Sequence, residues 1–560
     1  MNERTKTGLE ILQAAVLLGI LGDVLLRETP WGLNILLLVG ALVAAMTMLV
    51  LRRRNEFWTK HTIALNCALI FFAACFAWRD SAELQVFDAL AILTVFAVLT
   101  LPALKIKTQT ADVFHYVLGF IWSGISAAFA PFFLVFKDID WKTIPQTGWS
   151  KHLISVLRGL LIAAPILLVF GGLFVAADAI YEGIIRQTFN IEPAILVGHI
   201  FFTGFFSWIV AGYLRGSLIS GFASDKTNDK SKNLSITASK NVVVSQPLSV
   251  TEIKDEDAPQ PKETIKSEKK NWTWQNFDNT ILPRALTLGA IEISVVLGLI
   301  NLLFLSFVIV QIPYLFGGFE LVQNTPDFKL ADYARRGFGE LVTVAALVLP
   351  ILLTAHWLLR KDSPINEKIY RILAGIQIVL LFVIMASAAQ RLLILTGNLG
   401  YGLTTVRFYP MVCMMWLALV FGWFALTVLR GAREKFAWGA LWSAMFVLGI
   451  LHVVNPDAYI VRANVNLMRE GRRFDAFYNV SLSDDAVPVL LENLSLMSFE
   501  NQCVVKLKLS RRLAKANEGI DFRTWNYSRW NVQTALTEHA ENLDVSNCPS
   551  RQVDFYENDF

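Results

Sequence analysis

Residues 301–340 read NLLFLSFVIVQIPYLFGGFELVQNTPDFKLADYARRGFGE. The first part of this stretch closes an apolar run that starts near residue 291, and a helix that crosses a bilayer needs ~20 such residues. Gln311, Pro313 and the pair Gly317-Gly318 end the helix and permit a sharp turn. A polar loop follows and leads directly into the next apolar run. The alternation predicts a multi-pass membrane protein.

Composition supports this prediction along the whole chain. Of the 560 residues, 54% are hydrophobic and only 17% are charged, which lies outside the norm for soluble globular proteins. The net charge of +4 is small, and the basic residues fall in short loops between apolar runs. Because nucleic-acid binding needs a clustered basic face, we exclude it. The expected partner is the lipid bilayer.

The apolar runs predict an all-α integral membrane protein with about eleven transmembrane helices in two halves. Basic residues crowd alternate loops, for example Arg52-Arg53-Arg54 and Arg360-Lys361. The positive-inside rule therefore places the amino terminus in the cytoplasm and the carboxyl terminus outside. The predicted spans cover about residues 9–26, 32–51, 60–78, 84–104, 153–175, 193–214, 285–312, 338–359, 369–394, 409–430 and 437–454.

The segment 112–136 has the length of a span but carries basic residues beyond both ends. Gly119, Gly124 and Pro131 would allow two short half-helices that enter and return on the same side. We interpret the segment as re-entrant or interfacial, with a true span as the alternative. Broken backbone at membrane depth is tolerated only where protein or water covers it.

A change of composition divides the chain. Residues 222–276 are rich in Ser, Lys, Asp, Glu, Asn and Thr and are almost free of aromatic residues. Such a segment buries too little apolar surface to offset its loss of conformational entropy, so we predict a disordered cytoplasmic linker. It separates an amino-terminal membrane half, 1–221, from a carboxy-terminal membrane half, 277–455.

Residues 456–560 form the last predicted unit, an extramembrane helical tail. Its apolar residues recur at three-to-four spacing, which is typical of amphipathic helices, and Ser483 before two aspartates marks a helix start. Cys503 and Cys548 both lie in this tail. They could pair as a disulfide if the tail is exported to an oxidising compartment.

Ionisable residues inside spans are costly, so each is a functional hypothesis. On the predicted topology the outer third of the helices contains Asp23, Asp88, His199 and Arg391, whereas Glu292 lies toward the inner side. Simpler interpretations exist: Arg391 can extend its guanidinium to the interface, and the two aspartates can cap or hydrate helix ends.

An external polar pocket is the sharpest hypothesis. Arg335 and Arg336 stand between Tyr333 and Glu340, with Tyr314 at the end of the preceding span. Guanidinium groups and tyrosines in this arrangement could bind a phosphate or carboxylate group. The alternative is a local ion pair, because Arg336 and Glu340 are four residues apart on one helix.

Motifs for chemistry are otherwise lacking. The seven histidines are scattered, with neither HExxH nor another ligand spacing, and Gly171-Gly172 lacks the lysine of a phosphate loop. No GxSxG nucleophile motif occurs. We therefore predict no metal site, no cofactor and no catalytic residues, which favours a protein that is not an enzyme.

A set of motifs follows the later apolar runs and continues into the tail: Gln311-x-x-Tyr314-Leu315-Phe316-Gly317-Gly318, DYARRGF at 332–338, Tyr401-Gly402-Leu403-Thr404 with Arg407, Asn455-Pro456-Asp457-Ala458, and Trp525-Asn526-x-Ser528-Arg529. Together they resemble a bacterial multi-pass membrane family catalogued as a domain of unknown function, of the 4153/4173 type. The likeness runs from about 285 to 535 and is weaker before it, and Gly339 replaces an expected aromatic residue. The resemblance implies a bacterial inner-membrane protein and supplies no activity.

Three function classes remain open. The first is an envelope scaffold or sensor that presents an external loop and tail to a ligand or a protein partner, and it is our leading interpretation. The second is a transporter or flippase for an anionic or lipid-linked substrate. The third is a membrane-embedded transferase, which would need a carboxylate such as Asp23 or Asp88 as an acid or base.

Overall fold

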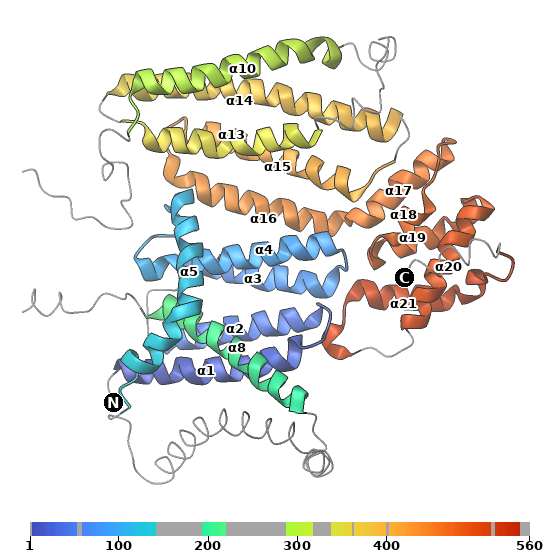
Figure 1. Cartoon of the computed structure of the whole chain (residues 1–560), viewed down its shortest axis with the longest axis horizontal. Helices are drawn as coiled ribbons and strands as arrows, with labels where there is room; N and C mark the ends of the chain where they lie inside the picture. Colours follow the sequence, from blue (N-terminus) through green and yellow to red (C-terminus); the bar gives the residue numbers. More distant parts are fainter. Residues whose placement is uncertain are drawn as a thin grey trace, which may run out of the picture.

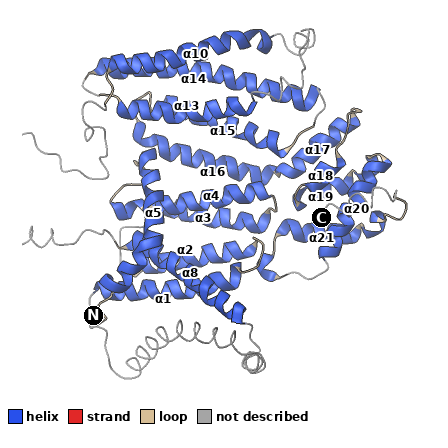
Figure 2. Ribbon diagram, viewed as in Figure 1, coloured by secondary structure: helices blue, strands red, loops and turns tan. Residues whose placement is uncertain are grey.

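A computed structural model describes residues 3–52, 59–141, 193–219, 287–316, 338–360, 363–398, 402–516 and 521–548. Within these ranges the chain forms helices and turns and no strand, apart from one isolated bridge between Leu288 and Leu359. Among the described residues, eleven helices are long and apolar enough to cross a membrane, which confirms the predicted all-α multi-pass class (Figures 1 and 2). The eleven include Val113–Asp138, which was not among the predicted spans. The predicted linker 222–276 and the predicted span 153–175 lie outside the described residues.

The long helices follow the predicted apolar runs closely. Several helix ends differ from the predicted bounds: α10, for example, continues through Gln311 and Pro313 to Phe316. Helix α14 begins before residue 369, where Ser363 accepts a hydrogen bond from the Ile365 N–H at 3.3 Å and Pro364 fits the first turn. The helices are α1 (Glu3–Leu26), α2 (Leu33–Leu51), α3 (Lys60–Trp78), α4 (Ala82–Leu99), α5 (Val113–Phe133), α8 (Pro193–Leu218), α10 (Ala290–Phe316), α13 (Phe338–Leu358), α14 (Pro364–Leu393), α15 (Thr405–Thr427) and α16 (Phe436–Val454).

The loops rich in basic residues gather at one end of the bundle, which we call the basic end. Arg52 after α2 lies 3.5 Å from Glu10 near the start of α1. Arg433 before α16 lies 3.5 Å from Asp112 before α5. Arg360 after α13 donates to the Thr287 hydroxyl before α10 at 2.9 Å. The carboxy-terminal helices lie at the opposite end of the bundle, on the right in Figure 1.

Helix α5 differs from its neighbours because it lies across the basic end instead of running alongside them (Figure 1). It is hydrogen-bonded to the ends of two helices. The Gly119 carbonyl of α5 accepts a bond from the Thr100 hydroxyl after α4 at 3.3 Å, and the Trp122 indole N–H of α5 donates to the Gly216 carbonyl in the last turns of α8 at 3.3 Å. Its continuation, the π-turn Leu134–Asp138, reaches the start of α1, where Asp138 pairs with Arg4 at 2.7 Å.

The interfacial interpretation of 112–136 stays a prediction, with a true span as its alternative. The helix is continuous through Gly119, Gly124 and Pro131, so the two half-helices of a re-entrant segment are absent from the described chain. Apolar side chains such as Phe120 and Phe129 stay more than half exposed, as expected for a face against lipid. Length and hydropathy alone would class α5 as a span.

The tail begins at one residue. Asn455 adopts φ +55° and ends α16, and its side chain accepts a bond from the Ala458 N–H at 3.3 Å to begin the next helix. Pro456 fits the first helical position. The helices that follow are α17 (Pro456–Arg469), α18 (Ala476–Ser481), α19 (Val487–Glu492), α20 (Phe499–Ala516) and α21 (Tyr527–Glu538), so the predicted helical tail is confirmed.

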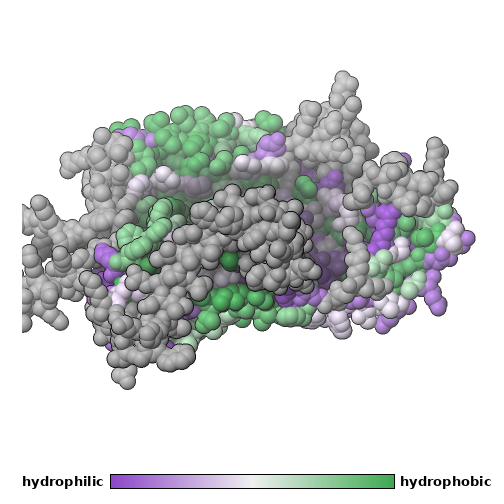
Figure 3. Space-filling model, turned by 60° about the horizontal axis from the view of Figure 1, so that its bottom comes forward, coloured by the Kyte–Doolittle hydropathy of each residue, from purple (hydrophilic) through white to green (hydrophobic). Residues whose placement is uncertain are grey.

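The tail shares a hydrophobic core with the membrane helices. One cluster of buried side chains runs from Phe72 and Phe76 on α3 through Leu451 on α16 to Ile460 and Leu490 in the tail. A separate core joins α10, α13, α14 and α15. Figure 3 shows hydrophobic residues on the visible surface of the bundle and more hydrophilic residues over the tail. The tail is therefore packed onto the bundle.

Candidate functional site at the junction of bundle and tail

The loop between α3 and α4 meets the tail through Arg79. Its Nη1 lies 3.0 Å from Oδ1 of Asp485, and its Nε donates to the carbonyl of His452 at 2.9 Å. Asp485 is nearly fully buried, with 1% of its side chain exposed. A carboxylate in this position is stable only with several donors, because burial without partners costs several kcal/mol.

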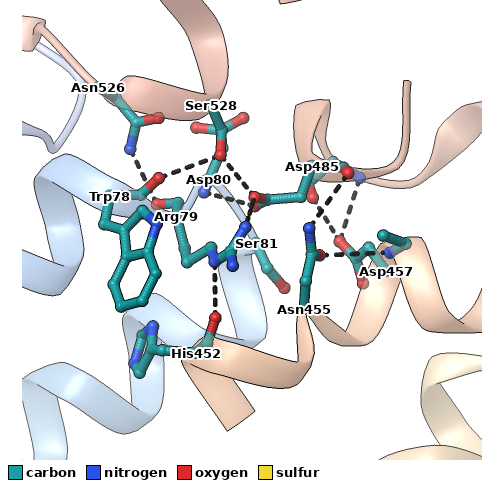
Figure 4. Close-up of polar contacts among 12 residues, drawn as sticks. Trp78, Arg79, Asp80, Ser81, His452, Asn455, Asp457, Asp485, Asn526 and Ser528 are labelled. Carbon is teal, nitrogen blue, oxygen red and sulfur yellow. Dashed lines mark hydrogen bonds and ion pairs between the residues drawn. The ribbon is translucent and has the colours of Figure 1, made fainter. Parts of the chain in front are cut away.

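Asp485 has those donors. Besides Arg79, the backbone N–H of Asp80 donates to Oδ2 at 2.7 Å, and the hydroxyl of Ser528 donates to Oδ1 at 2.5 Å (Figure 4). The three donors come from the α3–α4 loop and from α21. Asp485 therefore fixes the bundle to the tail, since both elements must be in place to satisfy it.

The tail also satisfies backbone groups at the end of α3. Asn526 donates to the carbonyls of Phe76 and Arg79 at 2.8 and 2.9 Å. The Ser528 hydroxyl, whose single proton goes to Asp485, also lies 3.0 Å from the carbonyl of Trp78. The last carbonyls of a helix have no partner within the helix, so these bonds complete α3. Arg529 then pairs with Asp80 at 2.6 Å.

A cavity of about 720 Å³ opens beside this network. Its walls come from the start of α4, from the first turn of α17, from the α18–α19 segment and from α21. The acidic side chains that line it are Asp80, Glu83, Asp457 and Asp484, and the basic ones are Arg512 and Arg529. The volume is that of a typical small-ligand site.

The charges in this cavity do not cancel. Arg529 is occupied by Asp80, and Arg512 lies 3.1 Å from Asp484 while also donating to the carbonyl of Leu482 at 2.7 Å. These two pairs leave Asp457 and Glu83, for which the described residues provide no ion pair. The cavity therefore has a negative balance.

Asp457 is the most unusual of these groups. Its Oδ2 accepts bonds from the hydroxyl and the N–H of Ser483, whereas its Oδ1 is buried and has no hydrogen-bond partner. Burial is the main cause that raises the pKa of Asp457 to about 6; the negative charges of Glu83 and Asp485 act in the same direction, and the bonds from Ser483 act against it. Burial likewise raises the pKa of Asp80 to about 6 in spite of Arg529. Asp457 can thus change its protonation near neutral pH.

Aromatic side chains complete the lining. Trp525 and Trp530, on either side of the start of α21, both line the cavity and are about two-fifths to one-half exposed. The hydroxyl of Tyr478 accepts a bond from the N–H of Thr405 at 2.7 Å and so holds this part of the wall to the start of α15. Indole faces beside carboxylates suit a cationic ligand.

Two of the predicted intramembrane residues contact each other. Asp23 on α1 lies 2.5 Å from Nδ1 of His199 on α8, with 5% of the aspartate and 50% of the histidine side chain exposed. The remaining three do not join them. Asp88 contacts His452 at 2.9 Å. Arg391 lies in the last turn of α14, and Glu292 is exposed in the first turn of α10. Helices α10 and α14 lie on the side of the bundle opposite α1 (Figure 1).

The predicted anion pocket lies mostly outside the described residues. This applies to Tyr333, Arg335 and Arg336 and to the side chain of Tyr314, whose backbone belongs to α10. Glu340 is described and is exposed in the first turn of α13. In the tail, Cys503 and Cys548 form a disulfide with Cα atoms 5.7 Å apart.

Sequence reasoning missed the junction cavity, although it noted several of the residues. In the sequence, the charges of Arg79 and Asp80 cancel within one short loop, and Asp484-Asp485 indicates only a helix start. The signal was the position of these polar residues: each follows or precedes an apolar run at the end opposite the basic loops. The motifs at 455–458 and 525–529 lie at that end too, and they supply Asn455, Asp457, Asn526 and Ser528.

Comparison with known proteins identifies a family. The model of the domain of unknown function DUF4153 matches residues 66–493, which is more than half of the chain. The match includes much of the amino-terminal half, where the predicted likeness is weaker, and it ends before the motif at 525–529. No curated protein and no solved structure matches the chain.

Proposed function

We propose that this chain, which belongs to the DUF4153 family, is a membrane-anchored sensor that binds a small organic cation in the junction cavity. One observation carries the proposal: the cavity holds two carboxylates, Asp457 and Glu83, that no described cation pairs with, beside Trp525 and Trp530. A protonated amine would supply the partner that Asp457 Oδ1 lacks, and the indoles would add cation–π attraction.

The position of the cavity supports a sensing role. Its walls belong to both the bundle and the tail, so a ligand that contacts Glu83 on α4 and Trp530 on α21 would strengthen the junction. Binding to one arrangement of the two parts and not to another shifts the equilibrium between them. Ligand binding would in this way strengthen the attachment of the tail to the bundle.

The test uses 1,4-diaminobutane as the cationic probe and 1,4-butanediol as its neutral counterpart of similar size. We expect the diamine to quench the tryptophan fluorescence of the purified full-length protein, whereas the diol does not. Asp457→Asn should weaken diamine binding about tenfold or more, which corresponds to the loss of a charged hydrogen bond of ~1.5–3 kcal/mol. The matched control is Asp544→Asn, an aspartate whose carboxylate lies at the surface of the tail and bonds Ser546.

Two results would oppose the proposal. Equal binding of the diol and the diamine would show that charge does not decide recognition. Unchanged affinity in Asp457→Asn would show that the unpaired carboxylate is not the binding group.

The orientation forms part of the proposal: basic end in the cytoplasm, tail outside, in a bacterial inner membrane. It is supported by the basic residues gathered at one end of the bundle and by the Cys503–Cys548 disulfide at the other, since disulfides persist in oxidising compartments. With the free cysteines replaced by serine, Ser495→Cys in the tail should react with an impermeant thiol reagent on intact cells, and Gln109→Cys after α4 should not. The reverse labelling pattern would invert the topology.

A protein partner of the tail extends the same proposal. Large apolar side chains remain about half exposed or more on the tail, among them Leu496, Phe499 and Phe522. Surface patches of this kind mark interaction sites more often than isolated exposed residues do. In-cell photo-crosslinking from position 499 should capture a discrete protein, and crosslinks to lipid alone would refute this part.

A membrane-embedded transferase is the second candidate, because an aspartate with a pKa of about 6 in a cavity can act as an acid or a base near neutral pH. The fate of the ligand distinguishes the two functions. A sensor returns the bound compound unchanged after incubation, whereas a transferase alters its mass.

A further inference from the structure

A second polar cluster lies inside the bundle, away from the junction cavity. Cys75 of α3, Asp88 of α4 and His452 of α16 each place one donor atom within 4.8 Å of the other two. All three residues are at most 1% exposed. The cluster joins helices far apart in sequence, since α16 belongs to the part of the chain that follows the predicted linker.

The cluster is not satisfied by protein contacts alone. Asp88 Oδ1 and His452 Nε2 are 2.9 Å apart, but Asp88 Oδ2 and His452 Nδ1 are both buried without a hydrogen-bond partner. An unsatisfied buried polar atom destabilises the folded protein, because it has lost its hydrogen bonds to water. Such atoms in a native structure call for an explanation, and a bound ion is one of the standard ones.

We propose that Cys75, Asp88 and His452 bind a divalent transition-metal ion, Zn²⁺ by preference. Thiolate, imidazole and carboxylate are all ligands of Zn²⁺, and a thiolate disfavours the hard cations Mg²⁺ and Ca²⁺. Bond lengths of ~2.0–2.3 Å around a tetrahedral ion put donor atoms roughly 3.5 Å apart. Small side-chain rotations therefore close the observed cluster around the ion.

Charge balance favours an ion at this depth. Binding releases the proton of the Cys75 thiol, whereas the neutral imidazole of His452 keeps its single ring proton. The ion then stands beside one thiolate, one carboxylate and one neutral imidazole, so its two positive charges meet two negative ones. A neutral site avoids the large cost of a net charge in a medium of low dielectric constant.

The ion would connect the membrane helices to the junction. The carbonyl of His452 accepts the bond from Arg79, and Arg79 pairs with Asp485. The indole of Trp78 stacks over the His452 ring with centroids 6.2 Å apart. Three protein ligands also leave a fourth position for water or another small ligand.

The first test is a metal titration of the full-length protein in detergent after treatment with a chelator. Co²⁺ serves as the coloured probe, because a cobalt–thiolate bond gives a charge-transfer absorption that cobalt with nitrogen and oxygen ligands lacks. We expect about one Co²⁺ per chain with this absorption, displaced by Zn²⁺. Cys75→Ser should abolish the band. Cys67→Ser, on the same helix, and Cys413→Ser, on α15, should retain it.

Variants of Asp88 and His452 measure how much each of these two ligands contributes to Zn²⁺ affinity. Asp88→Asn and His452→Gln should weaken Zn²⁺ binding by more than about 100-fold, the upper end of the cost of losing an outer hydrogen-bond partner of a ligand. Circular dichroism and gel filtration show whether each variant is folded. A thiolate band in Cys75→Ser, or unchanged Zn²⁺ affinity in His452→Gln, would overturn the assignment.

A measurement without any substitution keeps the test independent of folding. X-ray absorption of the Zn²⁺-loaded wild-type protein should show one sulfur at ~2.3 Å together with nitrogen and oxygen ligands at ~2.0–2.2 Å. A shell of nitrogen and oxygen alone, or no stoichiometric uptake of Zn²⁺, would leave a hydrogen-bonded Asp88–His452 pair and refute the metal site. Neither outcome affects binding of the diamine in the junction cavity.

Discussion

Two buried aspartates at the junction, Asp485 and Asp457, differ in the number of hydrogen-bond donors around them. Asp485 receives donors from Arg79, from the Asp80 N–H and from Ser528. Asp457 receives donors from Ser483 alone and keeps one oxygen buried and unpaired. A carboxylate with all its donors present is a structural joint, whereas one that lacks a donor is a place where a ligand can gain free energy.

Among the substitutions that test this difference, the largest loss of stability is expected at Asp485. Asp485→Asn removes the charge that Arg79 needs, and loss of one partner of a buried ion pair costs about 3–5 kcal/mol. We expect a lower unfolding temperature and easier proteolytic release of the tail. The matched control is Asp544→Asn, where the aspartate is exposed and should matter little. Equal proteolysis of the two variants would contradict a joint at Asp485.

Substitution of Asp457 by Asn should stabilise the protein near neutral pH, whereas substitution of Asp485 by Asn destabilises it. The pKa of Asp457 is raised from 3.8 to about 6 in the folded protein, so the unfolded chain gives up this proton more readily. The stabilising effect of the bound proton is complete below about pH 4 and is lost as the pH rises through about 6, a change of at most ~3 kcal/mol. Wild-type protein should therefore melt at a higher temperature at pH 5 than at pH 7.5. Asp457→Asn should flatten this dependence and raise the melting temperature at pH 7.5; a profile identical to wild type would assign the dependence to another group.

The smallest effect on stability is expected at Gly402, which lies where the segment before α15 contacts the tail. Gly402 has φ +73°, and an added Cβ would lie 2.8 Å from Oδ1 of Asn464. Asn464 holds the segment by accepting a bond from the Leu403 N–H at 2.7 Å. Gly402→Ala should cost about 1 kcal/mol or slightly more. Gly375→Ala on α14, where the added Cβ meets open space, should cost nothing measurable or stabilise the helix, and a melting temperature equal in both variants would argue against strain at Gly402.

The all-α, multi-pass membrane class and the helical tail could be predicted from the sequence alone. The reason is that span length and polarity are local properties: about twenty apolar residues are required wherever a helix crosses a bilayer. The helix start at Ser483 could be predicted in the same way, because capping involves residues only a few positions apart. Local physics also singled out Asp88, whose burial in an apolar run is unusual.

The contacts between polar groups, in contrast, are seen only in the tertiary structure. Asp80 and Arg529 are 449 positions apart, and Asp88 and His452 are 364 apart, so no spacing rule connects them. The direction of α5 was undecidable for a similar reason: its hydropathy suits a span, and only contacts with the ends of α4 and α8 place it across the basic end. Partners distant in sequence are chosen by packing, which depends on the whole chain at once.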